Sequence, residues 1–132
     1  MDVYAEIGLK DKLFDIKEAQ SLLPMVRSVT KAQREMLDPI QARLSKMLAN
    51  DPRRRVFERD FEFAVSLWRE KIELLGARVS GLWVVEFDVG GGSLCWQYPE
   101  LSLNYFRAHG ASFAERVKLA DYIDETDPDW AR

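Results

Sequence analysis

The sequence has few of the residues that build disulfide frameworks, metal sites and membrane spans. Its 132 residues include one cysteine and one histidine. A single cysteine excludes an intramolecular disulfide, and no paired His or Cys spacing forms a metal-binding motif. The longest uninterrupted apolar run, residues 82–85, is far shorter than the ~18 residues of a membrane-spanning helix. We therefore expect no metal, no cofactor and no membrane contact.

The N-terminus also lacks the features of a secretory signal, because acidic residues come early and no apolar segment follows them. The single cysteine agrees with a reducing compartment, so we expect a cytoplasmic protein. Apolar residues make up 47% of the chain and charged residues 31%, which is usual for a globular protein. At this length, and with no internal repeat, the sequence predicts one domain over residues 1–132.

Charge is divided unevenly along the chain. Residues 1–60 hold twelve Lys or Arg against ten Asp or Glu, whereas residues 61–132 hold seven against twelve. The net charge of −3 does not favour binding to a phosphate backbone. One basic cluster, Arg53–Arg55 with Arg59 one helical turn later, leaves weak nucleic-acid binding as an alternative to an ordinary solvated helix start.

Residues 14–77 are predicted to form an antiparallel helical hairpin. Asp15 and Glu18 make a capping box before a helix over about 16–49, in which apolar residues recur with the three–four spacing of a coiled coil. Pro24 and Pro39 are expected to bend this helix, and the sequence leaves open whether they kink or split it. A second helix runs from about Arg54 to residue 75, and Gly76 follows as its C-terminal cap.

The chain after residue 81 changes to a strand pattern. Residues 82–87, 94–98 and 102–105 predict a three-stranded antiparallel meander within 81–107. The triple glycine at 90–92 fits a hairpin turn better than a phosphate-binding loop, since a strand rather than a helix follows it. Ser112 and Glu115 form a second capping box and predict a short helix over 111–123. The whole is an α+β fold with an N-terminal arm (1–13) and an acidic tail (124–132).

Three residues are candidates for catalysis, although the preferred interpretation of each is structural. Cys95 lies in a predicted strand, where a cysteine is usually a small core residue, and His109 is the only imidazole available to activate it. Glu100 follows Pro99 in a turn, where a carboxylate accepts backbone N–H groups or pairs with an arginine such as Arg116. We therefore expect no enzyme activity to depend on them.

A ligand site in the same region is the main alternative to a purely structural role. Its candidate residues are Glu100, Tyr105, Arg107 and Arg116, and a pocket there would suit a small molecule. Glu86 and Asp88 share one face of a predicted strand, which we expect to be solvated.

Two stretches of the chain resemble a bacterial family catalogued as domain of unknown function 2203. The first is Phe14-Asp15-Ile16-Lys17-Glu18-Ala19 with Leu22-Leu23-Pro24, and the second runs from Gly81 through Phe87-Asp88, Leu94-Cys95-Trp96, Pro99-Glu100, Tyr105-Phe106, Phe113 and Arg116. The chain departs from the family pattern at three places. It has Phe106-Arg107 where the pattern has Trp-His, and it has Pro99 and Ser112 where the pattern has glycine. The resemblance implies the fold and a cytoplasmic bacterial origin, and it implies no activity.

The first helix carries more apolar surface than one neighbouring helix covers, because Leu22, Met25, Val29 and Met36 widen its stripe. The leading hypothesis is a non-enzymatic interaction module that forms a homodimer through its hairpin, as in a four-helix arrangement. The expected interface residues are Leu37, Ile40, Leu44 and Met47. The alternative is a small-molecule-binding protein or small enzyme with a site around Cys95, Glu100, Tyr105 and Arg116. A second alternative is the weak nucleic-acid binder described above.

Overall fold

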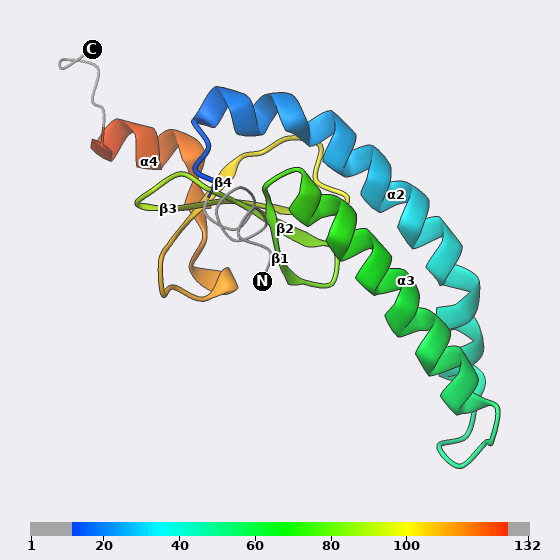
Figure 1. Ribbon diagram of the computed structural model, residues 1–132. Helices are drawn as coiled ribbons and strands as arrows, with labels where there is room; N and C mark the ends of the chain where they lie inside the picture. Colours follow the sequence, from blue (N-terminus) through cyan, green and yellow to red (C-terminus); the bar gives the residue numbers. More distant parts are fainter. Residues whose placement is uncertain (1–11, 127–132) are drawn as a thin grey trace, which may run out of the picture.

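A computed structural model describes residues 12–126, in which a helical hairpin packs on one face of an antiparallel sheet (Figure 1). The helices are α2 (Ile16–Lys46), α3 (Arg54–Leu74) and α4 (Leu119–Thr126), with a 3-10 turn, η1 (Phe113–Glu115). The strands are β1 (Arg78–Gly81), β2 (Val84–Asp88), β3 (Gly92–Gln97), β4 (Tyr105–Ala108) and β5 (Val117–Lys118), in that order across the sheet. The predicted α+β class is confirmed. The expected N-terminal arm lies almost wholly outside the described residues, as does the end of the acidic tail.

Helix α2 begins with the predicted capping box. The Glu18 N–H donates to Asp15 Oδ1 at 2.7 Å, and the Asp15 N–H donates to Glu18 Oε1 at 3.2 Å. Pro24 and Pro39 both lie inside the helix, which is continuous and gently curved, so neither proline splits it (Figure 1). Each proline removes one backbone hydrogen bond. Packing of the apolar face holds the helix together across both sites.

Helix α3 returns antiparallel beside α2, which confirms the predicted hairpin. Trp68 Nε1 donates to Thr30 Oγ1 at 2.9 Å, and the Arg43 guanidinium lies 5.4 Å from the centre of the Phe57 ring. These two contacts fix the register of the helices along most of their length. The start of α2 and the end of α3 pack on the sheet. The opposite end of the hairpin, with the α2–α3 turn, extends well beyond the sheet (Figure 1).

The sheet has five strands, not the predicted three. The sequence pattern does not indicate strand β1, because Arg78–Gly81 has no apolar run, yet this strand pairs with β2 across a two-residue turn at Leu82 and Trp83. Trp83 has φ 63°, so the residues predicted to start a strand make its turn instead. The third predicted strand, over 102–105, corresponds to β4, which begins only at Tyr105.

The predicted helix over 111–123 is wrong in its first half. The Ser112–Glu115 capping box does form, but it opens only the three-residue turn η1. Val117 then pairs with Phe106 and Lys118 with Tyr105, adding β5 to the exposed edge of β4. An unpaired strand edge offers backbone partners that a local capping signal does not reveal. Helix α4 starts only afterwards and runs through residues assigned to the acidic tail.

Strand alternation gives the sheet two chemically different faces. One face joins the helices in the hydrophobic core, with Val85, Phe87, Leu94, Trp96 and Phe106 among its buried members. The other face carries a polar set, namely Glu86, Asp88, Ser93, Cys95, Tyr105 and Arg107. A Cβ on Gly92 would collide with the Arg107 carbonyl oxygen and the Phe106 ring, so only glycine permits this approach of β3 to β4.

Candidate functional site

The polar face of the sheet gathers most of the residues predicted to carry chemistry. Register places Glu86 beside Cys95 and Cys95 beside Tyr105, in one row across β2, β3 and β4. The next row contains Asp88, Ser93 and Arg107. Arg116, which follows η1, reaches this face from outside the strands, and its guanidinium lies 4.2 Å from the centre of the Tyr105 ring. The face is therefore a compact cluster of opposite charges around a single thiol.

Glu86 and Arg107 form the buried ion pair of this cluster. The Glu86 residue is 6% exposed, and its carboxylate contacts the Arg107 guanidinium. Arg107 Nη1 also donates to the Ala111 carbonyl oxygen at 2.8 Å, which ties the 109–112 loop to the sheet. The expectation that Glu86 is solvated is wrong, because its side chain is buried beside the Arg107 guanidinium. Arg107, predicted as a ligand residue, is engaged within the protein.

Glu100 and Arg116 form a second pair at the edge of the same face. Arg116 Nη1 lies 3.3 Å and 3.2 Å from the two Glu100 carboxylate oxygens, and the Gln97 N–H donates to Glu100 Oε1 at 2.7 Å. The Arg116 guanidinium also lies against two aromatic rings, those of Tyr105 and Phe113. The predicted structural role of Glu100, accepting a backbone N–H and pairing with Arg116, is confirmed.

Cys95 has the environment of a core residue and not of a nucleophile. It is fully buried, and burial, reinforced by the negative charge of Glu86, raises the pKa of its thiol from 9.0 to about 11. His109 lies near the β2–β3 turn, where its Nε2 is 3.0 Å from the Gly90 carbonyl oxygen and 3.8 Å from Asp88 Oδ1. Because His109 contacts the turn, its imidazole does not serve Cys95 as a base.

The raised pKa predicts both the reactivity of Cys95 and a pH effect on stability. Native protein at pH 8 should react with a maleimide far more slowly than protein unfolded in urea, because the thiol is buried and protonated. The unfolded thiol ionises near pH 9 and the native thiol near pH 11. Unfolding therefore releases a proton between these values, and the free energy of unfolding should fall as pH rises through this window.

A Cys95→Ala variant, compared by urea titration at pH 8 and pH 10.5, is the matched control. The additional fall in stability of the wild-type chain should be absent from this variant. Equal labelling rates in native and unfolded wild-type protein would show that the native Cys95 thiol is not protected by burial.

Residues 12–126 contain neither a metal-ligand cluster nor a helix suited to span a membrane. No cluster of three or more His, Cys, Asp or Glu side chains within this range is arranged to hold a metal ion. None of the helices in the same range has both the length and the apolar character needed to cross a membrane.

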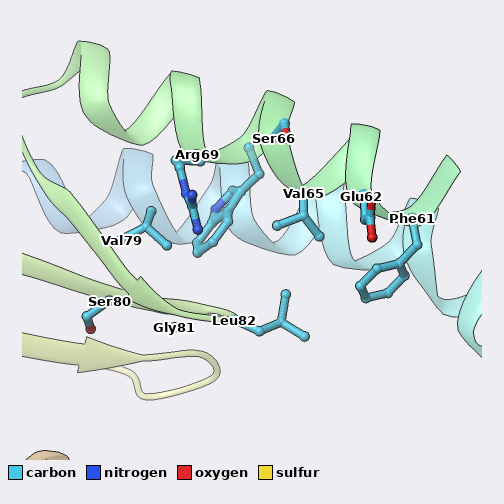
Figure 2. Close-up of a pocket in the computed structure, with 10 residues that line it drawn as sticks. Phe61, Glu62, Val65, Ser66, Arg69, Val79, Ser80, Gly81 and Leu82 are labelled. Atoms are coloured by element: carbon cyan, nitrogen blue, oxygen red, sulfur yellow. The ribbon is translucent and has the colours of Figure 1, made fainter. Parts of the chain in front are cut away.

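A groove that the sequence did not indicate lies between α3 and the β1–β2 turn (Figure 2). It has a volume of about 560 Å³, and Phe61, Val65 and Leu82 form its apolar part. Glu62 and Arg69 from α3 also line it. The groove depends on a turn that brings Leu82 up against a helix, which no local pattern specifies. It lies on the side of α3 that faces the sheet.

The predicted interface residues of α2 lie in or beside the seam between the two helices. Leu37 is 1% exposed, whereas Ile40, Leu44 and Met47 are half-buried. Arg54 of α3 donates to the backbone carbonyl oxygens of Leu44 and Met47, at 3.0 and 3.3 Å, which closes this end of the seam. These side chains therefore support the hairpin itself, and the exposed apolar surface lies on the adjacent side of the helices.

We define the outer face as the side of the hairpin turned away from the sheet. Its large exposed apolar residues are Met25 and Met36 of α2 and Val56, Phe63, Leu67 and Leu74 of α3. At 100° per residue, the four residues of α3 fall within about 40° of arc, roughly 120° around the helix from buried Trp68 and roughly 160° from buried Ile72. The hairpin register places Met36 level with Phe63 and Met25 level with Leu74.

Two of the four arginines in the basic cluster at the start of α3 are engaged in local pairs. Arg53 pairs with Asp51 at 2.9 Å, and Arg54 pairs with Glu58 at 3.4 Å in addition to its two carbonyl contacts. These contacts divert two of the arginines from the free basic surface that a phosphate backbone requires.

Comparison with known proteins gives one match. A family model described as "Uncharacterized conserved protein (DUF2203)" matches residues 12–119. This range contains both helices of the hairpin and all five strands. Neither the curated proteins nor the solved structures include a significant match.

Proposed function

The chain belongs to the family of uncharacterized conserved proteins DUF2203, and we propose that it is a non-enzymatic interaction module that self-associates through its helical hairpin. The observation that carries this proposal is the outer face, on which six large apolar side chains are exposed. Phe63 is 65% exposed and Met36 is 67% exposed, at the same level of the hairpin. Large apolar side chains exposed on one face in this way are typical of a protein–protein interface.

The size of the outer face suits a stable contact. A 21-residue helix such as α3 is about 30 Å long, and two helices side by side are roughly 20 Å wide. Their outer face thus offers about 600 Å², close to the ~800 Å² per partner of a standard interface. Burying it against a second hairpin would produce a four-helix arrangement. The two sheets would then lie on the outside, away from the contact.

The polar face supports this proposal over a small enzyme or ligand-binding protein. Glu100, Arg107 and Arg116 are each engaged in contacts within the chain, and the Cys95 thiol is fully buried. These contacts hold loop 109–116 on the sheet. Arg53 and Arg54 are similarly paired, which favours protein association over nucleic-acid binding.

The test is the mass of the purified full-length chain in solution. Light scattering after size exclusion should give a dimer with twice the 15.3 kDa chain mass, in an equilibrium that shifts with protein concentration. Phe63→Glu combined with Leu67→Glu should give a folded monomer, because it places four carboxylates in the centre of the contact. Circular dichroism verifies that the fold is kept.

Leu101→Glu is the matched control, since Leu101 is 79% exposed but lies on the loop before β4 rather than on the outer face. This variant should remain a dimer. A monomeric wild-type chain at high micromolar concentration, or a double variant that remains dimeric, would overturn the proposal.

A further inference from the structure

The apolar residues that α3 contributes to the outer face are spaced symmetrically about Val65. Val56 and Phe63 are seven residues apart, as are Leu67 and Leu74. When two copies of α3 lie antiparallel with the level of Val65 at the centre, Val56 faces Leu74 of the second copy and Phe63 faces Leu67. Every large apolar side chain of the stripe then meets another.

The charged residues beside the stripe are complementary in the same antiparallel register. The three facing pairs are Arg59 with Glu70, Arg55 with Glu73, and Asp60 with Lys71. All six side chains are exposed, and none of them forms an ion pair with another residue of the 12–126 range. Antiparallel helix pairs are selected by charges that flank an apolar seam in this way.

We propose that the protein forms a two-fold symmetric dimer in which α3 packs antiparallel against α3 of a second copy, with the level of Val65 on the two-fold axis. This inference rests on the proposed self-association and specifies its partner surface and register. A two-fold interface uses the same patch on both subunits, so each patch has to complement itself. The α3 stripe meets that requirement in both its apolar spacing and its charges.

The other face-to-face packing sets α2 against α3 of the second copy, with both hairpins pointing the same way. Met36 would then face Phe63, and Met25 would face Leu74, which is acceptable for the apolar residues. However, Arg59 would lie level with Ile40, and Glu70 level with Val29. That packing leaves these charges without partners, so charge complementarity favours the antiparallel α3 pair.

Charge reversal tests the register. Arg59→Glu should raise the dimer dissociation constant about tenfold, because symmetry places a like-charged pair at two points of the interface. Glu70→Arg should have a similar effect, and the double variant should return to within about twofold of wild type. Residues 59 and 70 are roughly 16 Å apart along one helix, so rescue has to act between chains. A double variant at least as weak as the weaker single variant would overturn the proposed register.

Cysteine cross-linking tests the orientation independently, in a Cys95→Ala background. Ser66→Cys, close to the axis, should be joined rapidly by a short bismaleimide. Arg59→Cys alone should not, although a mixture of Arg59→Cys and Glu70→Cys chains should. A dimer in which the Ser66 cysteine stays unlinked would overturn the antiparallel register but leave self-association intact. A monomeric chain would overturn both.

Discussion

Trp68→Ala is expected to lower the free energy of unfolding by about 3–5 kcal/mol, the usual cost of truncating a buried tryptophan. Trp68 is fully buried, its ring lies 5.0 Å from that of Trp83, and its Nε1 is bonded to Thr30. It therefore joins α2, α3 and the β1–β2 turn. Urea unfolding followed by circular dichroism measures the change in the Phe63→Glu/Leu67→Glu background, because this variant would be monomeric under the proposed self-association.

Two further variants separate the parts of this effect. Thr30→Val keeps the side-chain shape but leaves the indole N–H buried without its acceptor, which should cost about 1–3 kcal/mol. Thr30→Ser keeps the hydroxyl group and should cost less than Thr30→Val. Leu101→Ala, at a 79% exposed position, should change stability by less than about 0.5 kcal/mol. If Trp68→Ala were no more destabilising than Leu101→Ala, the central position of Trp68 would be refuted.

Arg107→Met should be nearly as damaging, with an expected loss of about 3–5 kcal/mol. The substitution removes the guanidinium that contacts buried Glu86 and also the hydrogen bond to the Ala111 carbonyl oxygen. A carboxylate that is 6% exposed would then have lost its countercharge. The same urea titration measures the loss, and faster proteolysis of loop 109–116 should accompany it.

Glu86→Gln combined with Arg107→Met should recover much of that stability, because the buried charge is removed together with its partner. Arg53→Ala provides the surface comparison: its ion pair with Asp51 is largely solvent-exposed on the arginine side, and its loss should destabilise the protein far less than Arg107→Met does. A double variant no more stable than Arg107→Met alone would show that the ion pair is not the source of the effect.

Local patterns were sufficient for the elements that depend on neighbouring residues. The capping box at Asp15, the three–four spacing of both helices and the glycine turn at 90–92 each act within a few residues, and each was predicted correctly. A carboxylate in the turn at Glu100 was predicted to accept a backbone N–H or to pair with an arginine such as Arg116, and it makes both contacts. The family resemblance from residue 14 to residue 116 was confirmed by the match over residues 12–119.

Non-local pairing decided what the sequence did not show. β1 and β5 are short and lack an apolar run, and they are strands only because β2 and β4 offer free edges. Glu86 is likewise buried beside Arg107, which lies two strands away in the sheet.

The sequence by itself thus determined the helical hairpin, the central meander and the absence of disulfide or metal-binding motifs, because periodicity and residue type act locally. Tertiary structure alone decided which apolar residues of the hairpin are internal. Leu37 and Met36 are adjacent in the sequence and both belong to its wide apolar stripe, yet one is buried against α3 and the other is exposed. The direction in which α3 approaches α2 makes that choice, and it leaves the outer face as the surface available to a second chain.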